Sequence, residues 1–386
     1  MSDPRSASRG ILMLISHFTP VVGGMETLAL QLGRGLVQRG YPITVVTQRP
    51  PGTAVCEDIS GIQVHRVLSG RGRGIVYALT YLASLLRALV RLHRQYRVLH
   101  ANHLYLEALG AALVGSVAKV PALAVNACGG VFGDFARLRK TRMILALPLL
   151  RRLDCVVALS REIRDELTAH GFAPGQIVQI PMGVDVERFV PAVEPGAARD
   201  QAGLGPETVL CLGRLDPQKG LEDALVAWAH VTVQKPAAQL VLVGDGPSRY
   251  ALEAQARALG LEGRVRFLGL RRDPEILLQG SQVFLFPSRS EGMPNALLEA
   301  MATGLPCVAS RIGGNSDLVE HGVSGMLIPP GDVRALAEAV ITLLDDPSLR
   351  NRLGTLARRV AVEQYSMDRI VRQYAELYAD LTGAHG

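Results

Sequence analysis

The chain has 386 residues, of which 48% are hydrophobic and 20% charged, a composition that excludes a disordered chain and gives room for two domains. Its five cysteines are odd in number and scattered without metal-ligand spacing, which argues against a disulfide framework or a zinc site and favours a reducing cytoplasm. The net charge of +6 is uneven, because residues 1–190 carry 22 Lys and Arg against 12 Asp and Glu.

The predicted elements begin with an apolar run at residues 11–15, which is too short for a signal-peptide core and is predicted as a strand. We expect no membrane span, because no stretch reaches the roughly 20 apolar residues that cross a bilayer. Residues 25–38 have helical periodicity, and Arg39 and Gly40 close that helix. Further strands of the first half are predicted at residues 43–47, 98–101, 122–125 and 155–159.

The second half has the same pattern of short apolar runs, with strands predicted at residues 209–212, 239–243, 265–267, 283–286, 306–309 and 325–328. Short apolar strands that alternate with longer helical patterns are typical of parallel sheets with crossover helices. The prediction is therefore an α/β protein with two doubly wound, Rossmann-like domains. The proline-rich stretch 190–205 is predicted as their linker. Ligands of such folds bind beyond the carboxyl ends of the strands, so the expected site is a central cleft between the domains.

Two segments combine basic and apolar residues, namely residues 75–97 and 137–152. Each is compatible with a basic amphipathic helix on an anionic membrane surface, where each basic residue contributes on the order of 1 kcal/mol. Each is equally compatible with a core-facing helix that has a solvated basic face. Nucleic acid is a weaker explanation, because the basic runs lack interleaved aromatic residues and no nucleic-acid-binding motif is visible.

Glycine-rich turns follow several predicted strands. Gly23 and Gly24 precede the first helix and permit close approach of the backbone to a ligand. Arg214 and Lys219, in the turn 212–220, could neutralise a departing diphosphate without a metal. The alternative is that both are surface cations, which their shared position at a strand end disfavours. Two further strand-end turns contain Gly244 in Gly244-Asp245-Gly246-Pro247 and Leu268 in Phe267-Leu268-Gly269.

Two carboxylates eight positions apart, Glu291 and Glu299, surround a predicted helix start near Pro294. The backbone N–H groups of a helix start attract anions, and the macrodipole adds about half a positive charge there. A phosphate can rest on that end while a nearby carboxylate accepts hydrogen bonds from sugar hydroxyls. The alternative interpretation is a solvated loop acid followed by a surface helix acid.

In their order along the chain, these motifs resemble family 4 of the retaining glycosyltransferases, which have the GT-B fold. The resemblance covers essentially the whole chain. Its most specific part is the run Pro-Ser-x-x-Glu-Gly-x-x-Asn-x-x-x-Glu-Ala-Met-Ala from Pro287 to Ala302. The resemblance implies an acceptor-side domain over residues 1–190 and a donor-binding domain over 191–364. It also implies a terminal helix, residues 365–386, that returns to the first domain.

The resemblance further implies the roles of individual residues. Arg214 and Lys219 would bind the diphosphate of a nucleotide-sugar, Glu291 would contact its sugar and Glu299 would hold the ribose hydroxyls. The implied donor is a UDP-sugar or a GDP-sugar, with no cofactor or metal required. Other donor-binding positions would be Gly23, Gly24, Gly213, Gly244, Leu268, Gly292, Met293, Pro294, Asn295, Ala296 and Leu297.

The chain departs from the family pattern at Ala127-Cys128-Gly129-Gly130, where many relatives have a histidine before glycine. His100 and His103 follow an earlier strand, and His103 is the candidate catalytic histidine, with a structural role as the alternative. Cys128 is predicted to be a small buried hydrophobe. The implied reaction keeps the anomeric configuration, with the leaving phosphate accepting the proton of the acceptor.

The implied acceptor is a glycan or a lipid-linked acceptor in cell-envelope or exported polysaccharide synthesis. The expected location is cytoplasmic, with peripheral contact to the inner face of an anionic membrane as an extension. Two alternatives stay open. One is a GT-B epimerase or phosphorylase, and the other is a catalytically weak partner subunit that binds a nucleotide-sugar, which the departure at Cys128 motivates.

Overall fold

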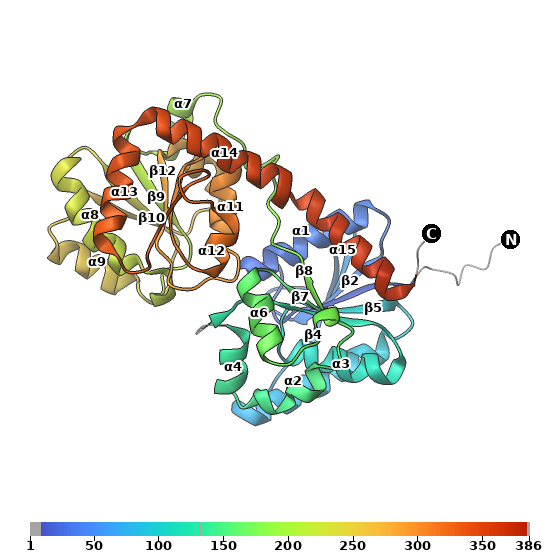
Figure 1. The fold of residues 1–386 in the computed structure, drawn as a ribbon. Helices are drawn as coiled ribbons and strands as arrows, with labels where there is room; N and C mark the ends of the chain where they lie inside the picture. Colours follow the sequence, from blue (N-terminus) through green and yellow to red (C-terminus); the bar gives the residue numbers. More distant parts are fainter. Residues whose placement is uncertain (1–8, 131–132, 384–386) are drawn as a thin grey trace. The chain divides into compact units, whose positions relative to one another are not determined.

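The structure is a computed structural model that describes residues 9–130 and 133–383. The chain divides into two compact units (Figure 1). The first unit ends at Met182 and is rejoined by the chain from Met367 onward, and the second unit runs from Gly183 to Ser366. Each unit is built on one sheet, and the described strands run parallel except for one edge strand of the first sheet, which confirms the predicted α/β class.

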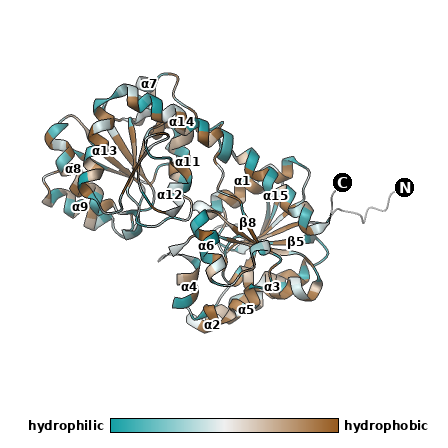
Figure 2. Ribbon diagram, viewed as in Figure 1, coloured by the Kyte–Doolittle hydropathy of each residue, from teal (hydrophilic) through white to brown (hydrophobic). Residues whose placement is uncertain are grey.

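The first sheet has eight strands in the order β3-β4-β2-β1-β5-β6-β7-β8. Only β3 runs antiparallel, against β4. The central strands are buried on both faces, as is typical of a parallel sheet covered by helices, and Figure 2 shows hydrophobic residues along them. The bounds are β1 Gly10–Leu14, β2 Ile43–Gln48, β3 Cys56–Ile59, β4 Ile62–Leu68, β5 Tyr96–Ala101, β6 Ala122–Asn126, β7 Cys155–Ala158 and β8 Ile177–Gln179.

The helices of the first unit are α1 Gly24–Gln38, α2 Gly74–Arg91, α3 Leu106–Ala118, α4 Asp134–Lys140, η2 Met143–Ala146, α5 Leu147–Leu150, α6 Arg161–Ala169, η3 Pro174–Gln176 and α15 Met367–Thr382. Helix α1 ends as expected, because Gly40 adopts a φ of +82° directly after the Arg39 cap. Helix α15 packs against α1, where the side chain of Val371 lies over Gly35. The last helix is therefore part of the first unit.

The second sheet has six parallel strands in the order β11-β10-β9-β12-β13-β14. Its bounds are β9 Thr208–Leu212, β10 Gln239–Val243, β11 Val265–Gly269, β12 Val283–Phe286, β13 Cys307–Ser310 and β14 Met326–Ile328. Its helices are α7 Pro195–Ala202, η4 Pro217–Lys219, α8 Leu221–Gln234, α9 Arg249–Ala258, α10 Pro274–Gly280, α11 Asn295–Ala302, α12 Gly313–Leu318, α13 Val333–Asp345 and α14 Pro347–Tyr365. The strand pattern predicted for both halves of the chain is confirmed.

The predicted linker over residues 190–205 is wrong. The stretch holds α7, which starts with Pro195 at its first position and ends at Gly203 with a φ of +64°. Helix α7 packs against α10 inside the second unit, and Gly280 of α10 lies against the backbone of Arg199. Proline at the start and glycine at the end bound a short helix, so the same residues that suggested a linker mark the two ends of α7.

The two basic segments behave differently. Residues 75–91 lie in one helix, α2, whereas residues 137–152 are divided among α4, η2 and α5, with Arg142 at a φ of +58° between the first two. Contrary to expectation, α2 is, by length and composition, apolar enough to cross a bilayer, with 22% of its 18 residues buried. A core helix of a soluble protein passes the same test, so this finding alone does not indicate a membrane span.

Candidate active site

The loops that follow β9 and β12 form the candidate site of the second unit. These strands are hydrogen-bonded neighbours, with Val209 paired to Val283 and Leu210 to Phe284. Both run in the same direction, so their carboxyl ends meet at one edge of the sheet. The loop after β9 carries Arg214 and Lys219, and the loop after β12 carries Glu291. Parallel pairing thus brings together residues that are more than 70 positions apart.

Lys219 and Glu291 form an ion pair, with Nζ 2.5 Å from Oε1. Their side chains are 21% and 10% exposed, so the pair is largely removed from water. The Lys219 ammonium also lies 5.4 Å from the centre of the Phe286 ring. A cation over an aromatic face gains further attraction, which helps to hold the flexible lysine in one position. The two candidate catalytic side chains are therefore in direct contact.

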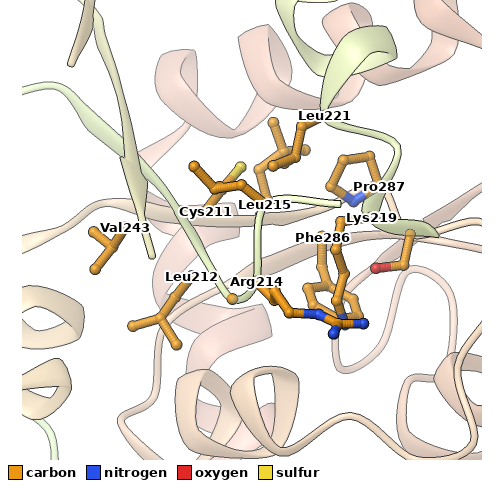
Figure 3. A pocket seen from close by; sticks show the side chains of 12 residues that line it. Cys211, Leu212, Arg214, Leu215, Lys219, Leu221, Val243, Phe286 and Pro287 are labelled. Atoms are coloured by element: carbon orange, nitrogen blue, oxygen red, sulfur yellow. The ribbon is translucent and has the colours of Figure 1, made fainter. Parts of the chain in front are cut away.

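Arg214 is held by a second acid, Asp216. The Nε atom of Arg214 lies 2.6 Å from Oδ2 of Asp216, while the arginine side chain stays 71% exposed. The other carboxylate oxygen of Asp216 accepts a hydrogen bond from the N–H of Gln218 at 3.0 Å and so caps η4. Figure 3 shows the Arg214 and Lys219 side chains extending toward Phe286. The site thus offers two positive groups on one side of the pocket.

Hydrogen bonds between the two loops fix their spacing. The Gln218 side chain donates to the carbonyl of Ser290 at 2.6 Å, and the Arg289 N–H donates to the carbonyl of Gln218 at 2.8 Å. Gly220 has a φ of +62°, and a Cβ there would collide with the carbonyl of Pro287. Glycine is required by both the backbone angle and the close approach. The two charged residues consequently sit on a rigid pair of loops.

Helix α11 begins beside Glu291, with Pro294 as its N-cap at a φ of −84° and a ψ of 119°. Pro294 therefore precedes the helix instead of lying in its first turn as predicted, and it has no N–H to donate. The N–H groups of Ala296 and Leu297 lie in the first turn, where an α-helix supplies no internal acceptors. The helix start can thus receive an anion through this turn.

Glu299 lies in the second turn of α11, as predicted. The pKa of its carboxyl is raised to about 7, mainly by burial, with the Arg188 guanidinium opposing the shift and Glu275 adding to it. Arg188 itself pairs with Glu275, its Nη2 atom 2.7 Å from Oε2. A carboxyl with a pKa near neutrality changes charge in the physiological range.

A small pocket adjoins the two loops (Figure 3). Its enclosed space of about 10 Å³ has room for roughly one water molecule. It is lined by Cys211, Leu212, Gly213, Arg214, Leu215, Lys219, Leu221, Val243, Leu285, Phe286, Pro287 and Ser288. Within the described part of the chain, the buried hydroxyl of Ser288 has no hydrogen-bond partner. No group of three or more His, Cys, Asp or Glu suited to a metal occurs in residues 9–130 and 133–383.

Comparison with known proteins decides the family. The model "Glycosyltransferase Family 4" matches residues 22–188, and "Glycosyl transferases group 1" matches residues 197–360. Glycogen synthase of Mycobacterium tuberculosis is 30% identical to this chain over 95% of the chain and 94% of its own length. The chain belongs to the group 1 glycosyltransferases. The N-acetyl-alpha-D-glucosaminyl L-malate synthase of Bacillus anthracis is similar over 94% of this chain and 95% of its own, with 28% identity.

Solved structures agree with the GT-B fold. Sucrose-phosphate synthase from Thermosynechococcus elongatus superposes with a TM-score of 0.85 and 26% identity, over 97% of this glycosyltransferase and all of that chain. HepE from Anabaena, solved in complex with UDP-glucose, gives a TM-score of 0.80 with 24% identity, over 96% of this chain and 99% of its own. The two α/β domains with parallel sheets that the sequence predicted therefore match the structures of GT-B glycosyltransferases.

Two other predicted donor-binding positions of the glycosyltransferase lie at the same edge of the second sheet. Gly244 follows β10 and lies directly against the carbonyl of Gly213, so that no side chain fits there. Leu268 is partly exposed near the carboxyl end of β11, whose neighbour is β10. The site residues predicted in the second unit therefore lie at the carboxyl ends of β9 to β12 or in α11, the helix that follows β12.

The remaining predicted site residues of the glycosyltransferase belong to the first unit. Gly23 is the N-cap of α1 with an extended φ of −165°, and Gly24 is the first residue of that helix. His103 follows β5 and is partly exposed. Burial raises the pKa of the Asp134 carboxyl, and nearby His103 opposes that rise. His100, by contrast, is fully buried, with Nδ1 2.6 Å from the Tyr378 hydroxyl. It is therefore a core residue and not a site residue.

Two local features were missed or misjudged from the sequence. Cys128 is partly exposed and not buried, because it lies beyond the end of β6 and outside the sheet. Asp216, which anchors Arg214, was not among the site residues predicted from the sequence. Its signal was present, since an aspartate directly before a proline is a common helix start. Spacing alone did not reveal that this cap also binds Arg214.

Proposed function

We propose that this glycosyltransferase moves a sugar from a nucleotide-sugar to a glycan or lipid-linked acceptor with retention of configuration. The observation that carries the proposal is the Lys219–Glu291 ion pair beside the exposed guanidinium of Arg214. Two cations and a helix start at one sheet edge suit a diphosphate, and a neighbouring carboxylate suits sugar hydroxyls. HepE, whose fold is similar, binds UDP-glucose, which supports a UDP-sugar, with a GDP-sugar as the other candidate.

In this proposal, Arg214 and Lys219 bind the diphosphate, Glu291 contacts the donor sugar and Glu299 accepts hydrogen bonds from the ribose. The backbone at Gly213, Gly244 and Leu268 and from Gly292 to Leu297 completes the donor site. The second unit is thus assigned to the donor and the first to the acceptor. In the first unit, the proposed contacts are made by Gly23 and Gly24 with the donor and by His103 near the reacting groups.

The chemistry follows from the charge that develops. As the bond between the anomeric carbon and the diphosphate breaks, negative charge grows on the leaving phosphate, and Arg214, Lys219 and the α11 start stabilise it. The acceptor oxygen bonds to the anomeric carbon on the same face. Its proton passes to an oxygen of the leaving phosphate, so no separate base is needed. Positioning supplies the rest of the rate enhancement.

Substitution of the two cations tests the proposal. In Lys219→Ala and Arg214→Ala, transfer of sugar from radiolabelled UDP-glucose and GDP-mannose to a bacterial lipid extract should fall by at least about tenfold, since each removes a charged hydrogen bond. Arg334→Ala, a 90% exposed arginine on α13, is the matched control. Normal turnover in either site variant removes that residue from the mechanism. Nucleotide binding by the native protein without any transfer favours a binding subunit instead.

The acceptor proposal draws on the surface of α2. Ile75 and Leu79 are 69% and 61% exposed, and Val90 on the same helix is also exposed. No Asp or Glu occurs between Asp58 and Glu107, whereas the neighbouring arginines are Arg71, Arg73, Arg87, Arg91 and Arg94. We propose that this surface rests on the anionic cytoplasmic face of a membrane, where lipid-linked acceptors are present. The related galactosyltransferase of Escherichia coli acts on a diphosphoundecaprenol-linked sugar.

Vesicle flotation tests this contact. The protein should float with vesicles containing about a third anionic lipid at low salt and less at high salt, because salt screens the arginines. Leu79→Glu should reduce flotation, whereas Val233→Glu, on an exposed residue of α8, should not. If Leu79→Glu floats as well as Val233→Glu, α2 is not the contact surface. That result, or a native protein that does not float at low salt, argues for a soluble acceptor.

A further inference from the structure

Polar side chains that the proposed function does not use follow three neighbouring strands of the first sheet. Strand β1 pairs with β5, and β5 pairs with β6. Ser16 comes after β1, Asn102 directly after β5, and Asn126 ends β6. Because the strands are parallel, these residues share the carboxyl edge of the sheet, where ligands of doubly wound folds bind.

Glu107 is an enclosed carboxylate at this edge. It lies in the first turn of α3 and is 1% exposed. Its Oε1 atom accepts hydrogen bonds from the Ser16 hydroxyl and, at 2.7 Å, from the Tyr81 hydroxyl. In the part of the chain that the structure describes, its Oε2 atom has no partner. The helix start offsets part of the cost of enclosing this charge, yet one oxygen stays without a donor.

Asn126 and Asn102 also have buried side-chain atoms without a hydrogen-bond partner among the described residues. Asn126 is fully buried, and neither its oxygen nor its nitrogen has a partner among the described residues. Asn102 donates to the carbonyl of Leu14 at 3.3 Å, while its own side-chain oxygen is likewise left over. Buried polar atoms in native proteins are nearly always paired, so a group of unpaired ones beside the partly exposed Ser16 marks this sheet edge as a polar site.

Ser16 is the member of this group that a ligand meets first, because it is partly exposed while Glu107 and the asparagines are enclosed. A hydroxyl has a single proton, and that of Ser16 is donated to Glu107. Toward a ligand, Ser16 therefore offers lone pairs alone and selects a group that donates. The adjoining carboxylate disfavours an anionic ligand group at this position.

We propose that Glu107 is a positioning residue that orients the Ser16 hydroxyl as a hydrogen-bond acceptor, and that Ser16 receives a hydroxyl group of a polyhydroxylated, uncharged acceptor moiety such as a sugar. This assignment rests on the proposed function and names the acceptor chemistry for the first unit. Tyr81 holds the second bond to the same carboxylate oxygen and keeps Glu107 in place.

The test uses the full chain, radiolabelled nucleotide-sugar donor, and two probes: octyl glucoside and octanol, which lacks the sugar. The native enzyme should transfer to octyl glucoside and far less to octanol. Ser16→Ala should raise KM for octyl glucoside about tenfold, as expected for one lost hydrogen bond, with the donor KM unchanged. Ser16→Thr keeps a hydroxyl and should restore most of the acceptor affinity. Glu107→Gln should raise the acceptor KM alone, since its amide can present an N–H to Ser16.

Ser116→Ala, on the same helix as Glu107, removes a hydroxyl that donates to the carbonyl of Ala112 and is the matched control. Among the monodeoxy analogues of octyl glucoside, one should have the same raised KM with the native enzyme and with Ser16→Ala. The hydroxyl that this analogue lacks is the one that Ser16 receives. Unchanged acceptor KM in Ser16→Ala and Glu107→Gln, or equal transfer to octanol, overturns this inference and leaves the proposed function standing. Donor binding without transfer to any acceptor overturns the proposed function itself.

Discussion

The Nζ atom of Lys219 lies 2.5 Å from the Oε1 atom of Glu291, and 72 positions of sequence separate the two residues. The pair joins the loop after β9 to the loop after β12, which are adjacent strands. In the proposed function, a diphosphate bound to Lys219 would act on the same ion pair that holds Glu291. This one contact would then link donor binding to the orientation of Glu291.

The first prediction concerns this coupling. Lys219→Ala and Glu291→Gln each leave a largely buried partner unpaired, so each should destabilise the protein. The double variant should lose less stability than the sum of the two, by on the order of 1 kcal/mol. Chemical denaturation of the three variants and the native protein measures this. Strictly additive losses would show that the pair contributes nothing.

The second prediction concerns pH and nucleotide binding. Because the pKa of Glu299 is raised to about 7, its carboxylate should be mostly protonated at pH 6 and mostly ionised at pH 8. If the carboxylate accepts the ribose hydroxyls, UDP should bind about tenfold more weakly at pH 6 than at pH 8. Calorimetry of the native protein and of Glu299→Gln tests this, and the variant should bind weakly with little pH dependence. The same pH dependence in both proteins would assign it to another group.

The raised pKa of Glu299 also predicts how the stability of the protein changes with pH. The pKa of Glu299 is raised in the folded state from an ordinary value of 4.5, so folding favours the protonated form. Its favourable contribution is complete below pH 4.5 and is lost as pH rises through 7. The melting temperature of Glu299→Gln should therefore increase relative to that of the native protein between pH 4.5 and 8. A constant difference across this range contradicts the raised pKa.

The third prediction concerns the glycine that brings the two loops together. In Gly220→Ala, strain from the φ of +62° and the collision with the Pro287 carbonyl should together cost more than about 1–2 kcal/mol. Gly260→Ala is the control, because Gly260 has a φ of +67° and nothing within 4 Å of the added Cβ. Denaturant titration should show a clearly larger loss for Gly220→Ala. Equal losses of stability in the two variants would mean that the loop around Gly220 accommodates the added Cβ without measurable strain.

The fourth prediction separates the two roles of Asp216. Asp216→Asn keeps a side-chain oxygen that can cap η4, but it loses the charge that pairs with Arg214. Its stability should stay close to native while sugar transfer falls several-fold. Asp216→Ala loses the cap as well and should be less stable by about 1 kcal/mol. Native turnover by Asp216→Asn would show that Arg214 needs no anchor.

Local sequence predicted much of the second unit. The apolar runs that form β9, β10 and β12 are continuous because a parallel sheet is buried on both faces, and this pattern is readable without tertiary information. The spacing from Glu291 to Glu299 likewise placed one acid in the loop and the other in the second turn of α11. These features depend on residues within one or two turns of each other.

Other features depend on contacts across the chain and were not readable. Arg199 and Gly280 meet only because α7 packs on α10, so residues 190–205 looked like a linker. The burial of His100 likewise depends on Tyr378 of α15, which lies far along the chain and contacts its ring nitrogen.

By itself, the sequence determined the fold class and the kinds of residue at each strand end, because periodicity and turn chemistry are local, and the order of its motifs carried the resemblance to the family. The tertiary structure decided which of those residues touch: Lys219 with Glu291, Arg214 with Asp216, and Ser16 with Glu107. The physical reason is that the order and register of strands in a sheet choose which distant loops become neighbours, and no local pattern encodes that choice.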